Sequence, residues 1–267
     1  MLSEGPLGTV LRVLGDVRLD ENRAWPLAIL LCFVAFLLLA SLLSRASKGL
    51  SLRDISGYRA IHQLVDGAAE SLIPFHFSPG TGILGGRQTA DSLAGLLAMS
   101  SVAARASGAR AEMRVTTPDP IVEAIGHGMM RPAEGLPRRA SAIEKERVQF
   151  LAPEPVAYAA GVMGALGRQR LSGSVMVGAF GDEYLLMAQA AVSHQLPQVV
   201  GATAPETLPF VVATTTTPLL GEEVFASGAY LTERPIYRAS LLAQDWLRNL
   251  VLAVVVGLAL LRSLGQI

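Results

Sequence analysis

Two apolar stretches lie near opposite ends of this chain, at Pro26–Leu43 and Leu250–Leu261, and a long middle region of mixed polarity separates them. The first has about 17 residues without a charge, close to the length of helix that crosses a bilayer core. The second has only about 13, so the long side chains of Arg248 and Arg262 would have to reach the two interfaces. The pattern predicts two transmembrane helices that hold one domain at a bilayer. A buried or in-plane helix is the alternative for the second.

Lysine and arginine residues near the ends of the spans predict the orientation. On the side of the middle region are Arg45, Lys48, Arg53, Arg59, Arg234, Arg238 and Arg248. On the other side are Arg12, Arg18, Arg23 and Arg262. Because basic residues are more numerous on the domain side, we expect a two-pass protein of the inner (plasma) membrane, with its domain in the cytoplasm and both termini outside.

These expectations divide the chain into an N-terminal tail (1–25), a first transmembrane helix (26–44), a cytoplasmic α/β domain (45–235), a connecting helix (236–249) and a second transmembrane helix (250–264). The net charge is zero and only 16% of residues are charged, so the composition offers no basic surface for nucleic acid. The one cysteine, Cys32, lies in the first apolar stretch. It excludes a disulfide or a thiolate metal site within one copy of the chain.

The middle region alternates between short apolar runs and stretches with helical periodicity. The runs that predict strands are Leu72–Phe77, Ala111–Thr116, Val148–Ala152, Val175–Phe180 and Gln198–Gly201. The predicted helices are Leu52–Glu70, Thr89–Ser107, Pro120–Met130, Glu154–Arg168, Asp182–Gln195, Pro205–Thr215 and Pro218–Tyr230. Wholly apolar strands separated by helices are typical of a parallel sheet covered on both faces. We therefore expect an α/β domain of three layers, Rossmann-like or flavodoxin-like, with a mainly parallel five-stranded sheet.

The turns after most predicted strands place a carboxylate at or near the start of the next helix. Such turns lie at the carboxyl ends of parallel strands, where open α/β sheets bind their ligands. The ligand-binding candidates in these turns, with one from a later Gly-Glu-Glu run, are Thr117, Asp119, Glu154, Gly181, Asp182, Glu183 and Glu222. Converging carboxylates suit a cation or a hydroxyl-rich molecule. The ordinary alternative is helix capping, in which each acid satisfies the free amides of its own helix.

The turn after the first strand differs, because Ser78–Thr89 holds four glycines and no acid. Its backbone amides could form an anion site. The candidates there are Ser78, Gly80, Thr81, Gly82 and Arg87. The turn has neither the G-x-G-x-x-G spacing nor the lysine of a P-loop. A flexible turn that leads into a helix is therefore the alternative.

Signatures of catalysis are missing from the sequence. It contains no G-x-S-x-G elbow, and its histidines lack the spacing of metal ligands. His76 lies inside an apolar strand, where we expect a core histidine with satisfied hydrogen bonds. The charged connection Met130–Arg147 is typical of a solvated loop, with a contact between subunits as the alternative.

Several segments resemble an uncharacterised family of prokaryotic membrane proteins, catalogued as a domain of unknown function. These segments are His76–Gly82, Thr89–Gly95, Thr116–Pro120, Ala152–Gly161, Val177–Tyr184 and Gly221–Phe225. The resemblance covers most of residues 50–250 and implies an α/β domain between two transmembrane helices. It implies no activity, cofactor or catalytic residue.

Together these features favour a membrane-anchored, non-enzymatic domain that acts as a self-assembling scaffold or as a sensor of a small polar ligand. Its expected partners are the lipid bilayer and further copies of the chain, and no cofactor is identified. The alternative is a membrane-bound enzyme that acts on a small polar substrate through His76 or the turn carboxylates. That alternative requires at least two of these side chains to converge on one open cleft beside the Ser78–Gly86 turn.

Overall fold

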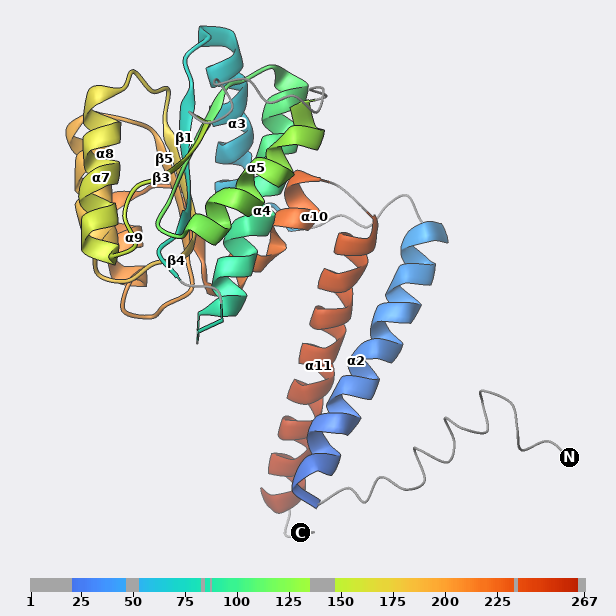
Figure 1. Ribbon diagram of the computed structural model, residues 1–267. Coiled ribbons are helices and arrows are strands. Elements are labelled where there is room, and N and C mark those ends of the chain that lie inside the picture. Colours follow the sequence, from blue (N-terminus) through green and yellow to red (C-terminus); the bar gives the residue numbers. More distant parts are fainter. Residues whose placement is uncertain are drawn as a thin grey trace, which may run out of the picture. The chain divides into compact units, whose positions relative to one another are not determined.

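The computed structural model describes residues 21–46, 53–82, 85–86, 88–134, 147–232 and 235–263 (Figure 1). The chain divides into two compact units. One is residues 51–237, and the other combines the two ends of the chain, Met1–Leu50 and Arg238–Ile267. The predicted contact segment Met130–Arg147 lies largely outside the described residues.

Residues 51–237 fold around a six-stranded sheet whose strands are all parallel. The strands are β1 (Phe75–Gly80), β2 (Met113–Thr117), β3 (Val148–Phe150), β4 (Ser174–Ala179), β5 (Gln198–Ala202) and β6 (Leu219–Leu220), in the order β3-β2-β1-β4-β5-β6. The five predicted strands are confirmed. The predicted strand number was wrong, because β6 is only two residues long and carries no pattern that distinguishes it from a turn.

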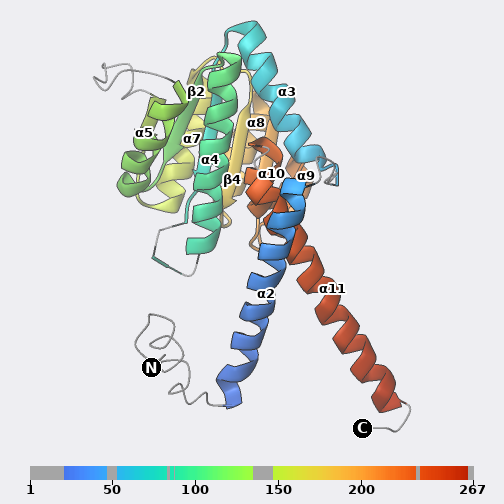
Figure 2. The ribbon, with the colours of Figure 1, turned by 90° about the vertical axis from the view of Figure 1, so that its right-hand side faces the viewer.

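Helices cover both faces of this sheet (Figures 1 and 2). One layer contains α3 (Ser56–Ser71), α4 (Thr89–Ala109) and α5 (Pro120–Glu134), and the other contains α7 (Pro155–Arg168), α8 (Tyr184–Ser193) and α9 (Leu208–Thr214). A 3₁₀ helix, η1 (Gly221–Ala226), and α10 (Ser227–Leu231) follow β6. The α/β class is therefore confirmed. The single helix predicted over Pro218–Tyr230 was wrong, since β6 and η1 occupy most of that range.

Close packing between α4 and the sheet depends on one glycine. A Cβ atom at Gly95 would lie 2.4 Å from the carbonyl oxygen of Pro79 and 2.7 Å from that of Val177. The helix can approach β1 and β4 this closely only because residue 95 has no side chain. On the opposite face, the core around Tyr158, Phe180 and Tyr184 is fully buried between the sheet and α7 and α8.

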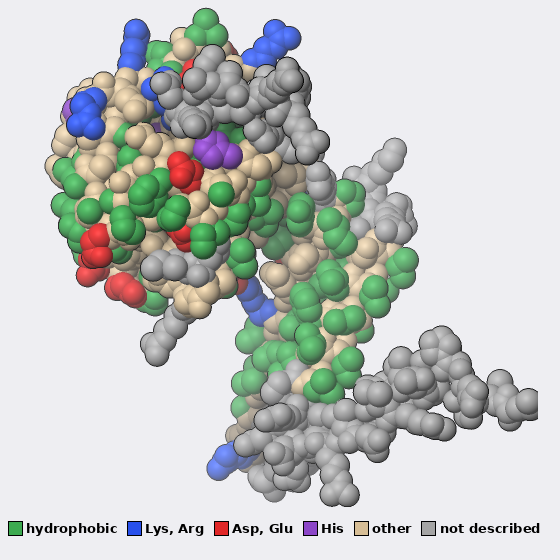
Figure 3. Space-filling model, viewed as in Figure 1, with side chains coloured by type: hydrophobic (Ala, Val, Ile, Leu, Met, Phe, Trp, Pro, Cys, Tyr) green, Lys and Arg blue, Asp and Glu red, His purple; other side chains and the backbone are tan. Residues whose placement is uncertain are grey.

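The chain ends form two long helices, α2 (Glu21–Ala46) and α11 (Pro235–Ser263). They meet around Ala40 and Ala239, and the ring of Phe36 packs edge-on against that of Trp246 with centroids 6.1 Å apart. Hydrophobic side chains cover much of the visible face of both helices (Figure 3). Small residues at the contact allow the two helix backbones to approach.

Among the described residues, one helix segment is long and apolar enough to cross a membrane, Pro235–Gly257. The apolar part of α2, Ile29–Leu42, falls short of that length. Of the two expected spans, only the C-terminal one meets the length and polarity required among the described residues. In the sequence, this span had looked the shorter of the two. Because α11 is continuous through Arg248, its apolar length includes the residues that the sequence suggested were only a connecting helix.

Candidate functional site

The sheet has a topological switch point between β1 and β4, where the strand order reverses direction. In open α/β sheets, ligands bind outside the carboxyl ends of the strands at such a point. The segments that leave these two ends are residues 80–82 and 179–183, which contain most of the candidates from the glycine-rich turn and from the Gly-Asp-Glu run. The structure therefore brings these two sets together.

Direct hydrogen bonds join the two segments. The backbone N–H groups of Thr81 and Gly82 donate to the carbonyl oxygen of Ala179 at 2.6 and 3.3 Å, and the Thr81 hydroxyl donates to the same oxygen at 3.2 Å. Gly80 has a φ of +101°, and a Cβ there would lie 2.4 Å from that oxygen. The amides of Thr81 and Gly82 therefore bond to the end of β4.

Glu183 is held within the same pair of segments. Its Oε1 atom accepts hydrogen bonds from the Thr81 hydroxyl and, at 2.9 Å, from the backbone N–H of Gly181. The neighbouring Asp182 is exposed. The Glu183 carboxylate therefore fastens the β4 loop to the β1 loop.

Replacing Glu183 with glutamine is expected to lower the free energy of unfolding by about 1 kcal/mol, because hydrogen bonds to a charged acceptor are stronger than those to a neutral one. The measurement is urea unfolding of the full chain in detergent, followed by circular dichroism. The matched control is Asp182→Asn at the neighbouring exposed carboxylate, expected to change stability by less than about 0.5 kcal/mol. Equal effects of the two substitutions would contradict this function of Glu183.

The other predicted acids do not join Glu183. Asp119 is 8% exposed and caps its own helix, since its Oδ1 atom accepts from the backbone N–H of Ile121 at 2.7 Å. Thr117 is buried and accepts from the N–H of Asp119 at 3.2 Å. Glu154 and Glu222 are exposed at the starts of α7 and η1. In the described parts of the chain, no group of three or more histidine, cysteine or acidic side chains could hold a metal ion. The candidate Arg87 lies outside the described residues.

Ser78 and His76 belong to a buried network on the α7 face of β1. The His76 ring bonds to the Ser174 hydroxyl through Nδ1 at 2.9 Å and to the Thr116 hydroxyl through Nε2 at 2.8 Å. The Tyr158 hydroxyl bonds to the Thr116 hydroxyl at 2.9 Å and to that of Ser78 at 2.7 Å. All five side chains are buried. The prediction of a satisfied core histidine is confirmed, and Ser78 has no access to solvent.

Burial sets the ionisation of this network. Desolvation lowers the pKa of His76 to about 4, so the ring is neutral at physiological pH. Desolvation also raises the pKa of Tyr158 to about 12, although its hydrogen bonds with Ser78 and Thr116 act in the opposite direction. Neither group is placed to exchange a proton with a substrate, since neither reaches a surface.

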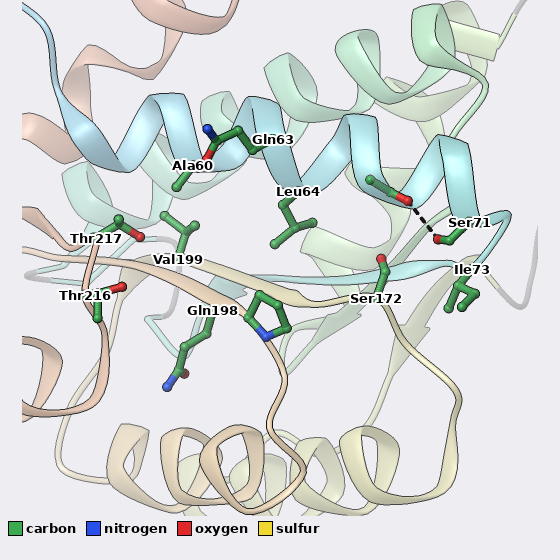
Figure 4. A pocket seen from close by; sticks show the side chains of 12 residues that line it. Ala60, Gln63, Leu64, Ser71, Ile73, Ser172, Gln198, Val199, Thr216 and Thr217 are labelled. Atoms are coloured by element: carbon green, nitrogen blue, oxygen red, sulfur yellow. Dashed lines mark hydrogen bonds between the residues drawn. The ribbon is translucent and has the colours of Figure 1, made fainter.

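Sequence reasoning missed a cavity of about 620 Å³ at the opposite, amino-terminal edge of the sheet (Figure 4). Its lining comes from α3 and from the segments that lead into β4, β5 and β6: Ala60, Gln63, Leu64, Gly67, Ser71, Ile73, Ser172, Pro197, Gln198, Val199, Thr216 and Thr217. These residues come from distant segments and form no motif. The helical periodicity of α3 could have shown only that Ala60, Leu64, Gly67 and Ser71 share one face.

The sequence model of the family described as "Domain of unknown function (DUF6754)" matches residues 16–266, and the chain belongs to that family. The match agrees with the uncharacterised family expected from the sequence and includes α2, the α/β unit and α11. No curated protein and no solved structure matches the chain.

Proposed function

We propose that this member of the family is a non-enzymatic sensor, in which an α/β unit binds a small ligand and communicates with membrane-anchored helices. The observation that carries the proposal is a set of contacts that fastens the two ends of the α/β unit to each other. Arg53 and Tyr58 come from the end that follows α2, and Glu223 and Tyr230 come from the end that leads into α11. We refer to these four residues as the junction.

The junction combines a stack, two hydrogen bonds and an ion pair. The rings of Tyr58 and Tyr230 are stacked, with centroids 4.8 Å apart and planes within 7°. Their hydroxyls donate to backbone carbonyls, Tyr58 to Glu223 and Tyr230 to Arg53, each at 2.5 Å. Arg53 also pairs with the Glu223 carboxylate at 2.5 Å. Burial, and then the nearby Glu223, raise the pKa of Tyr58, so its hydroxyl remains a donor.

This arrangement offers a route for a signal. Tyr58 lies in the first turn of α3, and Tyr230 lies in α10, after which the chain enters α11 at Pro235. A shift of α3 would therefore strain the stack and the hydrogen bonds that η1 and α10 make, shortly before the chain enters α11. Coupling of this kind requires a contiguous physical contact and a ligand that favours one arrangement.

The geometry supports the non-enzymatic reading over the alternative of an enzyme. The enzyme required at least two acid or base side chains around one open cleft beside the Ser78–Gly86 turn. Asp119 and Glu183 instead bond to amides of their own segments, and His76 is buried in a network.

The membrane assignment in this proposal includes both apolar helices. Leu30, Leu38, Val255 and Leu260 are exposed apolar residues on α2 and α11, and water solvates such surfaces poorly. We propose that both helices insert and that the excess of basic residues near the α/β unit keeps it in the cytoplasm. The strand order β3-β2-β1-β4-β5-β6 supports a Rossmann-like assignment for the unit.

A scaffold made of several copies is the second candidate, and the outer face of α7 and α8 favours it. The exposed apolar side chains there are Val156, Leu185, Leu186 and Val192. The only charged residue of α7 is Arg168 at its end, and α8 contains no charged residue. Native mass spectrometry of the full chain in nanodiscs separates the candidates. A discrete retained mass supports the sensor, whereas a defined oligomer with no retained mass supports the scaffold.

Replacing Tyr230 with leucine tests the junction. Loss of the stack and of one hydrogen bond amounts to about 2 kcal/mol, so amide exchange at residues 53–58 is expected to rise about 30-fold. If the junction couples the units, exchange at the start of α11 rises as well. The measurement is hydrogen–deuterium exchange of the full chain in nanodiscs.

The control is Phe225→Leu, which changes a partly exposed aromatic residue of η1 outside the junction. We expect no change in exchange at either place. Faster exchange at residues 53–58 of the Tyr230→Leu variant, without any change in α11, would refute the coupling.

A further inference from the structure

We infer that the cavity beneath α3 binds an uncharged molecule with an apolar body and hydroxyl groups. It lies at the amino-terminal edge of the sheet, away from the switch point. We refer to it as the α3 groove, defined by the twelve residues that line it. The inference deepens the proposed sensor by naming its ligand class, and its link to signalling rests on that proposal.

The groove exists because the sheet ends early on this side. β6 pairs only with Gly201 and Ala202, so the first part of β5, from Gln198 to Val200, has no strand beyond it. The segment before β6 runs past this uncovered part instead and contributes Thr216 and Thr217 to the lining. A two-residue strand thus leaves a gap where a longer β6 would cover the sheet.

Small side chains on α3 keep the space above this gap open. Ala60, Leu64, Gly67 and Ser71 recur at helical spacing and line the groove, and three of them are small. Figure 4 shows Ala60, Leu64 and Ser71 along α3. A Cβ at Gly67 would meet nothing within 4 Å. Leu64 forms an apolar base, packed so closely that a Cβ at Gly173 would lie 2.8 Å from its Cδ1 atom.

The lining selects against charge. None of the twelve lining residues is acidic or basic, so a charged group would lose its hydration without gaining an ion pair. Apolar contacts come from Leu64, Ile73 and Val199, and the volume of about 620 Å³ is in the usual range of small-molecule sites. An uncharged molecule with an apolar part is the ligand that this surface stabilises.

Hydroxyl recognition is available at the sides of the groove. In the described part of the chain, no hydrogen bond engages the side chains of Gln63, Thr216 or Thr217. An amide and two hydroxyls can each donate and accept, which matches the hydroxyl groups of a polyol or sugar. Gln198 is different, because its side chain points away from the groove and donates to the carbonyl oxygen of Thr214 at 2.7 Å.

The probe for the test is hexyl β-glucoside, which has an uncharged sugar head and a short alkyl chain. Binding to the full chain in nanodiscs is followed by hydrogen–deuterium exchange at residues 60–73 and 196–200, and affinity by titration. We expect the probe to slow exchange in both segments. Hexanoate, which has a similar alkyl chain and a charged head, is expected to bind at least about tenfold more weakly.

A substitution that fills the groove locates the site. Gly67→Phe places a ring in open space and is expected to weaken glucoside binding at least about tenfold. The matched control, Gly67→Ala, adds one methyl group and is expected to keep the affinity within about twofold. Thr217→Val removes a hydroxyl with little change in shape and is expected to weaken binding about fivefold.

Each outcome decides the inference. No protection of residues 60–73 by the glucoside, equal binding of hexanoate, or binding that Gly67→Phe leaves unchanged would overturn it. The sensor proposal fails separately, when the glucoside protects the groove and leaves exchange in α11 unaltered. A Gly67→Phe variant that does not fold leaves the comparison of glucoside with hexanoate and the Thr217→Val variant to decide.

Discussion

Replacing Gly95 with alanine is expected to destabilise the α/β unit by about 3 kcal/mol, because the added Cβ would overlap backbone atoms of two strands. The nearest are the carbonyl oxygens of Pro79 at 2.4 Å and Val177 at 2.7 Å. Backbone atoms in the centre of a sheet cannot move aside as the end of a flexible side chain can. Helix α4 must therefore move away from β1 and β4, which loosens packing along its length.

Gly108→Ala in the same helix is the matched control. A Cβ there would meet nothing within 4 Å, so alanine is expected to stabilise the helix by about 0.5 kcal/mol through its higher helix propensity. Both variants are compared with the natural chain by urea unfolding in detergent, followed by circular dichroism. A Gly95→Ala variant as stable as the natural chain would show that the close approach of α4 to the sheet is not needed.

Acid is expected to destabilise the protein through His76. The pKa of this ring is lowered from 6.5 to about 4 by burial in the folded state, whereas the unfolded chain has the ordinary value. The unfolded state therefore binds the proton more readily than the folded state does. The contribution of the neutral ring is fully present above pH 6.5 and is lost as the pH falls towards about 4. The loss amounts to about 3 kcal/mol over that window.

The variant that isolates this effect is His76→Gln. A glutamine amide is uncharged at every pH and can both donate and accept, so it can bond to the hydroxyls of Ser174 and Thr116. The measurement is the free energy of unfolding at a series of pH values between 7 and 4 for both proteins. As the pH falls across this range, the free energy of unfolding of the natural chain is expected to decrease relative to that of the His76→Gln variant. Parallel pH profiles would show that His76 does not control acid stability.

Secondary structure was largely predictable from the sequence because it depends on local patterns. All five predicted strands formed, and Tyr58, Ile61, Leu64 and Val65 gave α3 its buried face at helical spacing. The errors lie where a local pattern is too short or is overridden. β6 has only two residues, and Arg248 suggested an end to an apolar stretch that α11 passes through as one helix.

The candidate site was predictable only in part. Thr81, Gly181 and Glu183 do meet across the β1 and β4 ends, as residues at the carboxyl ends of adjacent parallel strands should. The sequence did not show that these strands are adjacent, or that their loops bond to each other. Asp119 takes the capping role that was its ordinary alternative.

By itself, the sequence determined the α/β class, the parallel strands and the two apolar ends, since each follows from the spacing and polarity of neighbouring residues. Only the tertiary structure decided which side chains share one environment. The network of His76 with Tyr158, the junction of Tyr58 with Tyr230 and the α3 groove each join segments far apart in the chain. Such contacts depend on strand order and on the close approach of helices, and no local pattern specifies either.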